Sequence, residues 1–265
     1  MKIYDCFMYN NEDFVLDLRL NILNKYIEKF IIIESKIDHQ GNKKKLNFDI
    51  KNFKNFENKI QYYVIEDFPK NFNNWQRENF QRNFISEGIK LARDNDYIIV
   101  SDVDEIPNLK NPNNLDYLKK NKYTVFKQKN FLYKLNLINK SFPNWFGSKC
   151  CQKKHLKSPQ WLRDQKIKKF SIFKFYRINW NIIEDGGWHF SYLMKPDAIQ
   201  KKLKSFAHAE FNNEFYTNIE RIKNLIDSKK DLFDRDQMYE KIKVDNTYPK
   251  FILENLEEFS EFILK

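Results

Sequence analysis

Three carboxylates stand close together at Asp102, Asp104 and Glu105, directly after the apolar run 97–100 and just before Pro107. Open α/β sheets bind ligands beyond the carboxyl ends of their strands. Negative charge that is concentrated there is costly unless a cation or hydrogen bonds offset it. A divalent ion held by one or two carboxylates and by the phosphates of a substrate offsets it well. The D-x-D-E pattern therefore predicts a metal-dependent enzyme for a diphosphate-bearing donor, and a solvated acidic turn is the alternative.

A second segment, 184–192, combines two acids, two adjacent glycines and a histidine. The glycines indicate a sharp bend, after which His189 enters an aromatic strand. His189 is a candidate ligand for the same ion, and imidazole beside carboxylate suits Mn²⁺ somewhat better than Mg²⁺. The alternative is a hydrogen-bonded structural histidine. Glu184 and Asp185 are either ordinary loop acids or the base that deprotonates an attacking hydroxyl.

The elements that must position these residues alternate in the first half of the chain. Short apolar runs predict strands, and helical spacing predicts helices between them. We expect strands at 3–9, 29–34, 60–65 and 97–101, and helices at 14–23 and 75–93. Such alternation predicts a largely parallel sheet with helical crossovers.

The second half has a different pattern, with long aromatic strands and no helix between them. We expect strands at 123–133, 144–149 and 170–180, added to the sheet in antiparallel fashion. Pro196 is suited to the first turn of a helix. Apolar residues on one stripe predict an amphipathic helix over 248–264.

Composition narrows the class of protein. Hydrophobic residues make up 42% of 265 residues, so extensive disorder is excluded, and the net charge of +11 favours acidic partners. These are phosphorylated substrates, an anionic membrane surface or nucleic acid. The three cysteines cannot all pair, no apolar run reaches the ~18 residues of a membrane span, and no signal peptide is evident. We therefore expect a cytoplasmic protein in a reducing compartment, with peripheral membrane contact open.

A nucleic-acid-binding protein or a metal-dependent nuclease is the alternative class, because it explains both the charge and the acids. The segment 126–131 alternates aromatic residues with lysines, which could stack bases over a basic groove. An amphipathic strand shows the same alternation, and no recognisable nucleic-acid-binding signature accompanies it. We therefore expect no nucleic acid.

Several segments, taken in order, resemble glycosyltransferase family 17, whose best-known members are β-1,4-mannosyl-glycoprotein 4-β-N-acetylglucosaminyltransferases. The resemblance covers roughly the first two hundred residues. Its segments are Ile3-Tyr4-Asp5-Cys6-Phe7, Asn11-Glu12, Arg19-Leu20-Asn21, Ile33-Glu34-Ser35, Trp75-Gln76-Arg77-Glu78, Gln81-Arg82-Asn83, Ser101 to Pro107 and Trp188-His189-Phe190-Ser191.

The resemblance implies a GT-A (Rossmann-like) fold, a UDP-sugar donor, a divalent cation and inversion at the anomeric carbon. UDP-GlcNAc is the donor that the family implies, and a glycan is the acceptor. The fold is then one domain over 1–265. It divides into a nucleotide-binding half at 1–120, an acceptor and metal half at 121–195, and a helical part at 196–265.

Roles carried over from the family fall on particular residues. Asp104 would bind the metal with His189, while Asp102 would approach the metal or the ribose. Asp185, or less readily Glu184, would be the catalytic base. The residues implied for the donor are Glu34, Arg77, Arg82, Asp102, Val103, Asp104 and Glu105.

Some of these roles have structural alternatives. Arg82 could pair with Glu78 one helical turn away, and Glu105 could orient the loop instead of touching the donor sugar. Of Glu12 and Glu34, each of which could instead cap a helix, we favour Glu34 for the nucleotide. His39 and His155 are expected in solvated loops. His208 is expected within a helix, where we favour a packing role over a catalytic one.

Overall fold

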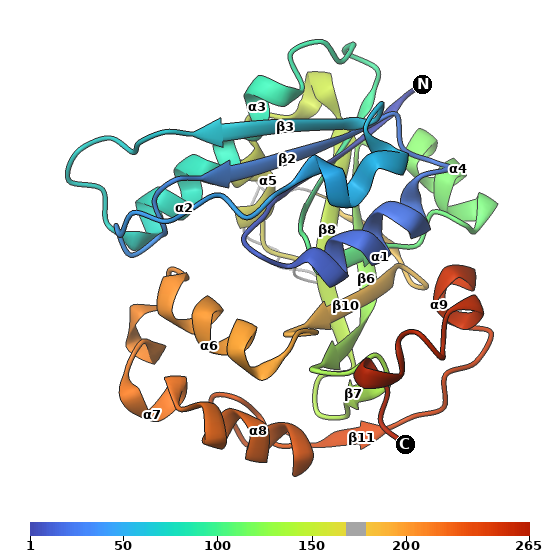
Figure 1. Ribbon diagram of the computed structural model, residues 1–265. Helices are drawn as coiled ribbons and strands as arrows, with labels where there is room; N and C mark the ends of the chain where they lie inside the picture. Colours follow the sequence, from blue (N-terminus) through green and yellow to red (C-terminus); the bar gives the residue numbers. More distant parts are fainter. Residues whose placement is uncertain (168–178) are drawn as a thin grey trace, which may run out of the picture.

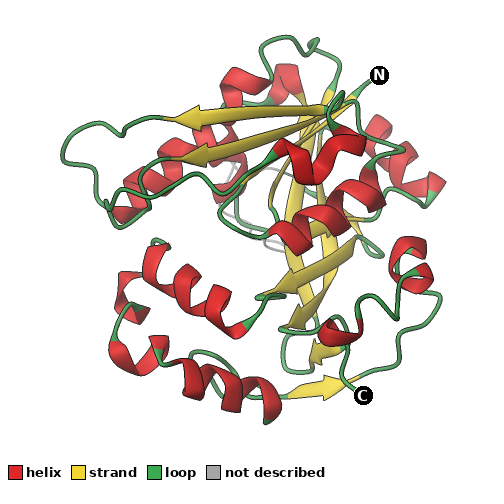
Figure 2. Cartoon of the chain, in the orientation of Figure 1, coloured by secondary structure: helices red, strands yellow, loops and turns green. Residues whose placement is uncertain are grey.

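The computed structural model describes residues 1–167 and 179–265. Within them, eleven strands form one mixed sheet with helices on both faces (Figure 2). The strands are β1 (Ile3–Met8), β2 (Lys29–Ser35), β3 (Ile60–Ile65), β4 (Tyr97–Asp102), β5 (Glu105–Pro107), β6 (Tyr123–Leu132), β7 (Leu137–Asn139), β8 (Asn144–Gln152), β9 (Asn181–Ile183), β10 (Gly187–Ser191) and β11 (Tyr239–Lys241).

The helices follow the same chain order. They are α1 (Asp13–Leu23), α2 (Asn74–Asn83), α3 (Ile85–Gly88), α4 (Pro112–Lys120), α5 (Pro159–Asp164), α6 (Pro196–Ser205), α7 (Glu214–Thr217), α8 (Ile219–Asp227) and α9 (Lys250–Glu254). Four 3₁₀ helices, among the described residues, lie at Ile50–Phe56, Lys153–His155, Ala209–Phe211 and Ser260–Phe262. No helix in this part of the chain is both long and apolar enough to cross a bilayer.

The first half of the sheet is parallel, as the sequence predicts. Strands β3, β2, β1 and β4 pair in that order, all parallel. Strands β1, β2 and β4 are buried along nearly their whole length, which explains their continuous apolar runs. Their carboxyl ends therefore meet at one edge of the sheet, and the acidic turn follows β4 at this edge.

The second half adds antiparallel strands, as expected. Strand β8 pairs antiparallel with both β4 and β6. Strand β10 pairs antiparallel with β5, and this register places His189 opposite Glu105. Gly187 has φ +123°, and a Cβ there would lie 2.1 Å from the carbonyl oxygen of Ile106, so the bend requires glycine. The predicted strand at 170–180 falls almost entirely outside the described residues.

Two predicted helices are wrong in extent. In place of one helix over 75–93, the structure has α2, which ends at Asn83, and the short α3, which ends at Gly88. Leu91 therefore lies beyond the helices and is 86% exposed. The tail expected as one helix over 248–264 is helical only at α9 and Ser260–Phe262. The apolar stripe predicted correctly that the tail is buried, for example at Ile252. It predicted wrongly that the tail is one unbroken helix.

The C-terminal part returns to the sheet through the segment 205–208. Figure 1 shows α6, α7 and α8 grouped on one side of the sheet's edge. Ser205 Oγ accepts a hydrogen bond from Asn10 Nδ2 at 3.1 Å, and the Ser205 carbonyl accepts one from the backbone N–H of His39 at 3.1 Å. The segment thereby faces the carboxyl ends of β1 and β2.

Candidate active site

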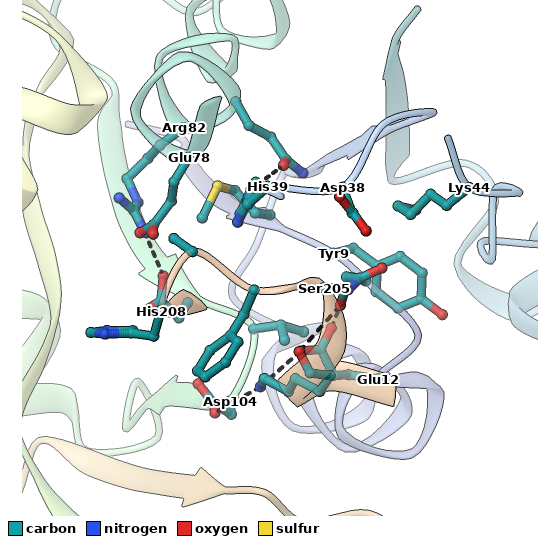
Figure 3. Close-up of a pocket in the computed structure, with 18 of the residues that line it drawn as sticks. Tyr9, Glu12, Asp38, His39, Lys44, Glu78, Arg82, Asp104, Ser205 and His208 are labelled. Atoms are coloured by element: carbon teal, nitrogen blue, oxygen red, sulfur yellow. Dashed lines mark hydrogen bonds and ion pairs between the residues drawn. The ribbon is translucent and has the colours of Figure 1, made fainter. Parts of the chain in front are cut away.

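A cavity of about 270 Å³ lies where β1, β2 and β4 end, and α6 and the segment 205–208 close it (Figure 3). Ligand sites of open α/β sheets occur at this edge. Figure 3 shows Glu12 and Asp104 close together at one side of the cavity, with Arg82 and Glu78 at another. The cavity thus carries both signs of charge.

Arg19 fixes the acidic turn from inside the protein. Its guanidinium is fully buried and pairs with Asp5 through two hydrogen bonds of 2.7 and 2.6 Å. Its other N–H groups donate to the hydroxyl of Ser101 and to the carbonyl oxygens of Asp102, Val103 and Glu105. A buried charge is tolerated when it is paired and hydrogen-bonded in this way.

Glu105 is also a structural residue. Its side chain is buried and receives Arg163 through two hydrogen bonds of 2.7 and 3.0 Å. Trp145 Nε1 and the backbone N–H of Asp102 donate to the same carboxylate at 2.8 and 2.9 Å. Glu105 therefore orients the loop, and its carboxylate has no oxygen left for a donor sugar.

Asp102 faces two arginines. Its Oδ1 lies 3.2 Å from Arg82 Nη2, and its Oδ2 lies 3.0 Å from Arg163 Nη2. Burial alone would raise the pKa of Asp102, but the charges of Arg163 and Arg82 outweigh it and hold the pKa well below its usual value. Asp102 is therefore an anion engaged with protein cations, which leaves Asp104 as the better metal ligand of the two.

Asp104 is different because its carboxylate is nearly buried and loosely partnered. Its Oδ1 lies 3.8 Å from His189 Nε2, and its Oδ2 lies 4.0 Å from Lys202 Nζ. Within the described residues, no hydrogen bond reaches either carboxylate oxygen. A buried carboxylate in this condition favours a bound cation.

His189 is oriented to present a lone pair to Asp104. Its Nδ1 lies 3.1 Å from Asn130 Oδ1, and the Asn130 amide is fixed because its Nδ2 donates to the Phe142 carbonyl at 3.0 Å. Nδ1 therefore carries the proton, and Nε2 is the free nitrogen. The imidazole also stacks on Trp145, with ring centroids 4.7 Å apart.

The pair Asp104 and His189 fits a divalent ion only in part. Among the described residues, no group of three or more His, Cys, Asp or Glu side chains could hold a metal. Ions such as Mg²⁺ are commonly bound by one or two protein carboxylates together with substrate phosphates and water. The two residues therefore fit a metal that is completed by a diphosphate.

Lys202, which the sequence did not single out, lies in the site beside Glu12, the acid ranked below Glu34. Lys202 Nζ lies 3.0 Å from Glu12 Oε1, and the Glu12 carboxylate also accepts the backbone N–H of Asn10 at 2.8 Å. Burial alone would lower the pKa of Lys202, but Glu12 and Asp104 outweigh it and raise the pKa. A permanent cation therefore lies beside the acids.

Glu34 and Arg77 form hydrogen bonds with the loop that follows β2. Glu34 is buried and accepts hydrogen bonds from Lys44, Asn47, Phe48 and Tyr62. Arg77 donates to the His39 carbonyl at 3.0 Å. Both residues hold the loop that follows β2, and the cavity lining within the described residues includes Glu12 instead of Glu34. The structure therefore places Glu12 at the cavity and Glu34 behind it, among its own hydrogen-bond partners.

The structure does not bring Glu184 and Asp185 to the cavity. They precede β10 and are exposed. Glu184 pairs with Lys127 at 2.6 Å, and Asp185 accepts a hydrogen bond from Asn108 Nδ2 at 3.0 Å. Proton abstraction requires the base within hydrogen-bond reach of the substrate, so this position gives neither residue that role.

Two histidines differ from expectation. His39 lies in a loop but is only partly exposed: its Nε2 lies 2.8 Å from Gln81 Oε1, and burial is the main cause of its lowered pKa. His208 is not inside a helix, because α6 ends at Ser205. It lies just before a short 3₁₀ helix and lines the cavity instead.

A second cavity of about 880 Å³ adjoins the first. Aromatic side chains form much of its lining: Phe131, Phe142, Trp145, Phe146, Tyr192, Phe211, Phe233 and Tyr239. Among the described residues, five line both cavities: Asp102, His189, Lys202, Phe206 and His208. The two cavities therefore meet at the acidic turn.

A comparison with protein families agrees with this arrangement. The model of glycosyltransferase family 17 matches residues 1–243 of the 265. The match extends into the C-terminal part that contributes Lys202 and His208. A comparison with curated proteins finds no match. Because the family model covers most of the sequence, the chain belongs to glycosyltransferase family 17.

Proposed function

We propose that this protein is a metal-dependent, inverting glycosyltransferase of GT-A type that takes a sugar from a UDP-sugar donor. The observation that carries the proposal is the loosely partnered Asp104 carboxylate facing the free Nε2 of His189. Family membership supports glycosyl transfer and favours it over a nuclease or a nucleic-acid-binding protein. The parallel β3-β2-β1-β4 order, with the cavity at its carboxyl edge, supports the GT-A type.

Asp104 and His189 would hold Mn²⁺ or Mg²⁺, together with oxygens of the donor diphosphate. When bound, such an ion neutralises charge on the departing UDP. Lys202 supplies a further positive charge on the cavity wall. Asp102 and Val103 form the cavity wall between the strand end and Asp104, held there by Arg19. UDP-GlcNAc is the first donor to test, because the family resemblance points to it.

The second cavity is the proposed place of a neutral glycan acceptor. Phe142, Trp145 and Phe146 are 60%, 41% and 38% exposed, although they are large apolar residues. Exposed apolar groups gathered at a groove mark binding sites. Aromatic faces pack against the apolar faces of sugar rings, and the neighbouring amides can bond to hydroxyls. Membrane contact remains a separate proposal, supported by the net charge of +11.

The reaction breaks the bond between the donor's anomeric carbon and the β-phosphate oxygen. The acceptor oxygen forms the new bond to that carbon, its proton passes to a base, and UDP leaves with the electron pair of the broken bond. For inversion, the acceptor must approach from the side opposite UDP. The junction of the two cavities is where such an approach can take place.

Calorimetric titration with UDP tests the metal part of the proposal. We expect UDP to bind on the order of 100-fold more tightly with Mn²⁺ than with a chelator, and Asp104→Asn to abolish this difference. Asp116→Asn, which changes an exposed acid on α4, is the matched control and should behave as wild type. Equal affinity with Mn²⁺ and with chelator would overturn the metal assignment.

A further inference from the structure

The junction of the two cavities restricts the choice of a catalytic base. This inference rests on the proposed function: an acceptor hydroxyl must reach the anomeric carbon of the donor. It must therefore lie where the cavities meet. Among the described residues, only five line both cavities, so the base should be one of them. They are Asp102, His189, Lys202, Phe206 and His208.

Four of the five are unsuitable for a physical reason. Phe206 has no proton-accepting group, and Lys202 is a protonated cation paired with Glu12. Asp102 has each oxygen engaged by an arginine, which makes it a weak base. His189 has its protonated nitrogen on Asn130 and its free nitrogen directed at Asp104. His208 is the residue that remains.

His208 has the geometry of a base with a fixed tautomer. Its Nδ1 lies 2.8 Å from Glu210 Oε1. The hydrogen bond from His208 lowers the pKa of Glu210, so Glu210 is ionised at neutral pH and can only accept. Nδ1 therefore donates, and Nε2 carries the lone pair. The His208 ring packs against the Trp75 ring edge-on, with centroids 4.6 Å apart, which holds it at the cavity wall.

We propose that His208 is the catalytic base of the transfer and that Glu210 is its positioning residue. Nε2 of His208 takes the proton of the acceptor hydroxyl as the oxygen attacks the anomeric carbon and the bond to UDP breaks. The His208 side chain is 45% exposed, so the proton can then pass to water. The charged residues that line the same two cavities are Glu210 on its own segment, Glu12, Asp38, Lys44, Glu78, Arg82, Asp102, Asp104, Lys202 and Arg235.

The test measures UDP release from UDP-GlcNAc with Mn²⁺, using water or a mixture of neutral methyl glycosides as acceptor. We expect His208→Gln to lower kcat by about 10²- to 10⁴-fold and to leave the Kd for UDP within about twofold. Added imidazole should partly restore turnover in His208→Ala. His155→Gln, which lies outside both cavities, is the matched control.

Glu210→Gln separates positioning from structure. We expect a smaller loss of kcat, about tenfold, with the Kd for UDP unchanged, because an ionised carboxylate can only accept the Nδ1–H, whereas an amide can also donate and no longer fixes the tautomer. Wild-type turnover in His208→Gln, or loss of its UDP binding, would overturn the inference alone. Failure of the wild type to bind UDP would overturn the proposed function. UDP binding without UDP release from UDP-GlcNAc or from any other UDP-sugar of a donor panel would overturn both.

Discussion

The two walls of the first cavity hold their charged groups in different ways. The sheet wall, formed by the residues from Ser101 to Glu105, is fixed by Arg19, which is fully buried, and by Arg163, whose side chain is 14% exposed. Arg19 and Arg163 together bind most of its polar atoms. The helical wall, formed by α6 and the segment 205–208, presents Lys202 and His208, whose side chains are 21% and 45% exposed.

From this difference we infer that the sheet wall is fixed, whereas the charged groups of the helical wall can change partners. Buried charges with several hydrogen bonds lose free energy when they change partners, so the sheet wall is a rigid frame beside the proposed donor site. Partly exposed charges with one close partner can exchange that partner for a substrate oxygen or a proton. The loosely partnered Asp104 lies where the two walls meet.

The largest expected effect is on stability, when Arg19 is removed from the sheet wall. Arg19→Met would leave Asp5 and several carbonyl oxygens buried without their partner, so we expect a loss of about 3–5 kcal/mol in the free energy of unfolding. Chemical denaturation measures it. Lys119→Met removes an exposed pair with Asp116 and should cost less than about 1 kcal/mol. Equal losses in the two variants would contradict the frame.

Lys202→Met tests the helical wall. If Lys202 moves from Glu12 to a phosphate oxygen, the variant loses a charge-assisted hydrogen bond of roughly 1.5–3 kcal/mol, or about 10- to 150-fold in Kd for UDP. Calorimetry with Mn²⁺ present measures it. The neighbouring Lys201→Met is the control, because the Lys201 side chain is 71% exposed. Unchanged UDP affinity in Lys202→Met would confine Lys202 to a structural pair with Glu12.

The smallest expected effect concerns the second cavity. Phe142→Ala should raise the acceptor KM several-fold without changing UDP affinity, and should alter stability by less than about 0.5 kcal/mol, because the ring is exposed. Steady-state kinetics with the acceptor varied measures the change. Tyr117→Ala, an exposed aromatic residue on α4, is the control. An effect on UDP affinity instead would place Phe142 in the donor site.

Local pattern was enough for much of the fold. The strand limits of β3 agree with the prediction, and those of β1, β2 and β4 differ from it by one residue. Parallel strands that are buried on both faces consist of nearly continuous apolar residues, and such a run is recognisable in the sequence alone. The prediction of one helix over the tail failed because an apolar stripe indicates only which residues are buried. Short helical turns joined by bends bury the same residues.

For the site, the sequence by itself determined which acids follow the strand and which histidine enters beside them. Those positions are set by local spacing, and β10 then brings His189 opposite Glu105. Only the tertiary structure decided which acids are engaged and which are available. Glu34 is saturated while Glu12 faces the cavity, and Lys202 and His208 arrive from a distant helix and its following segment. A side chain's partners depend on which surfaces pack together, and one-dimensional spacing does not record that.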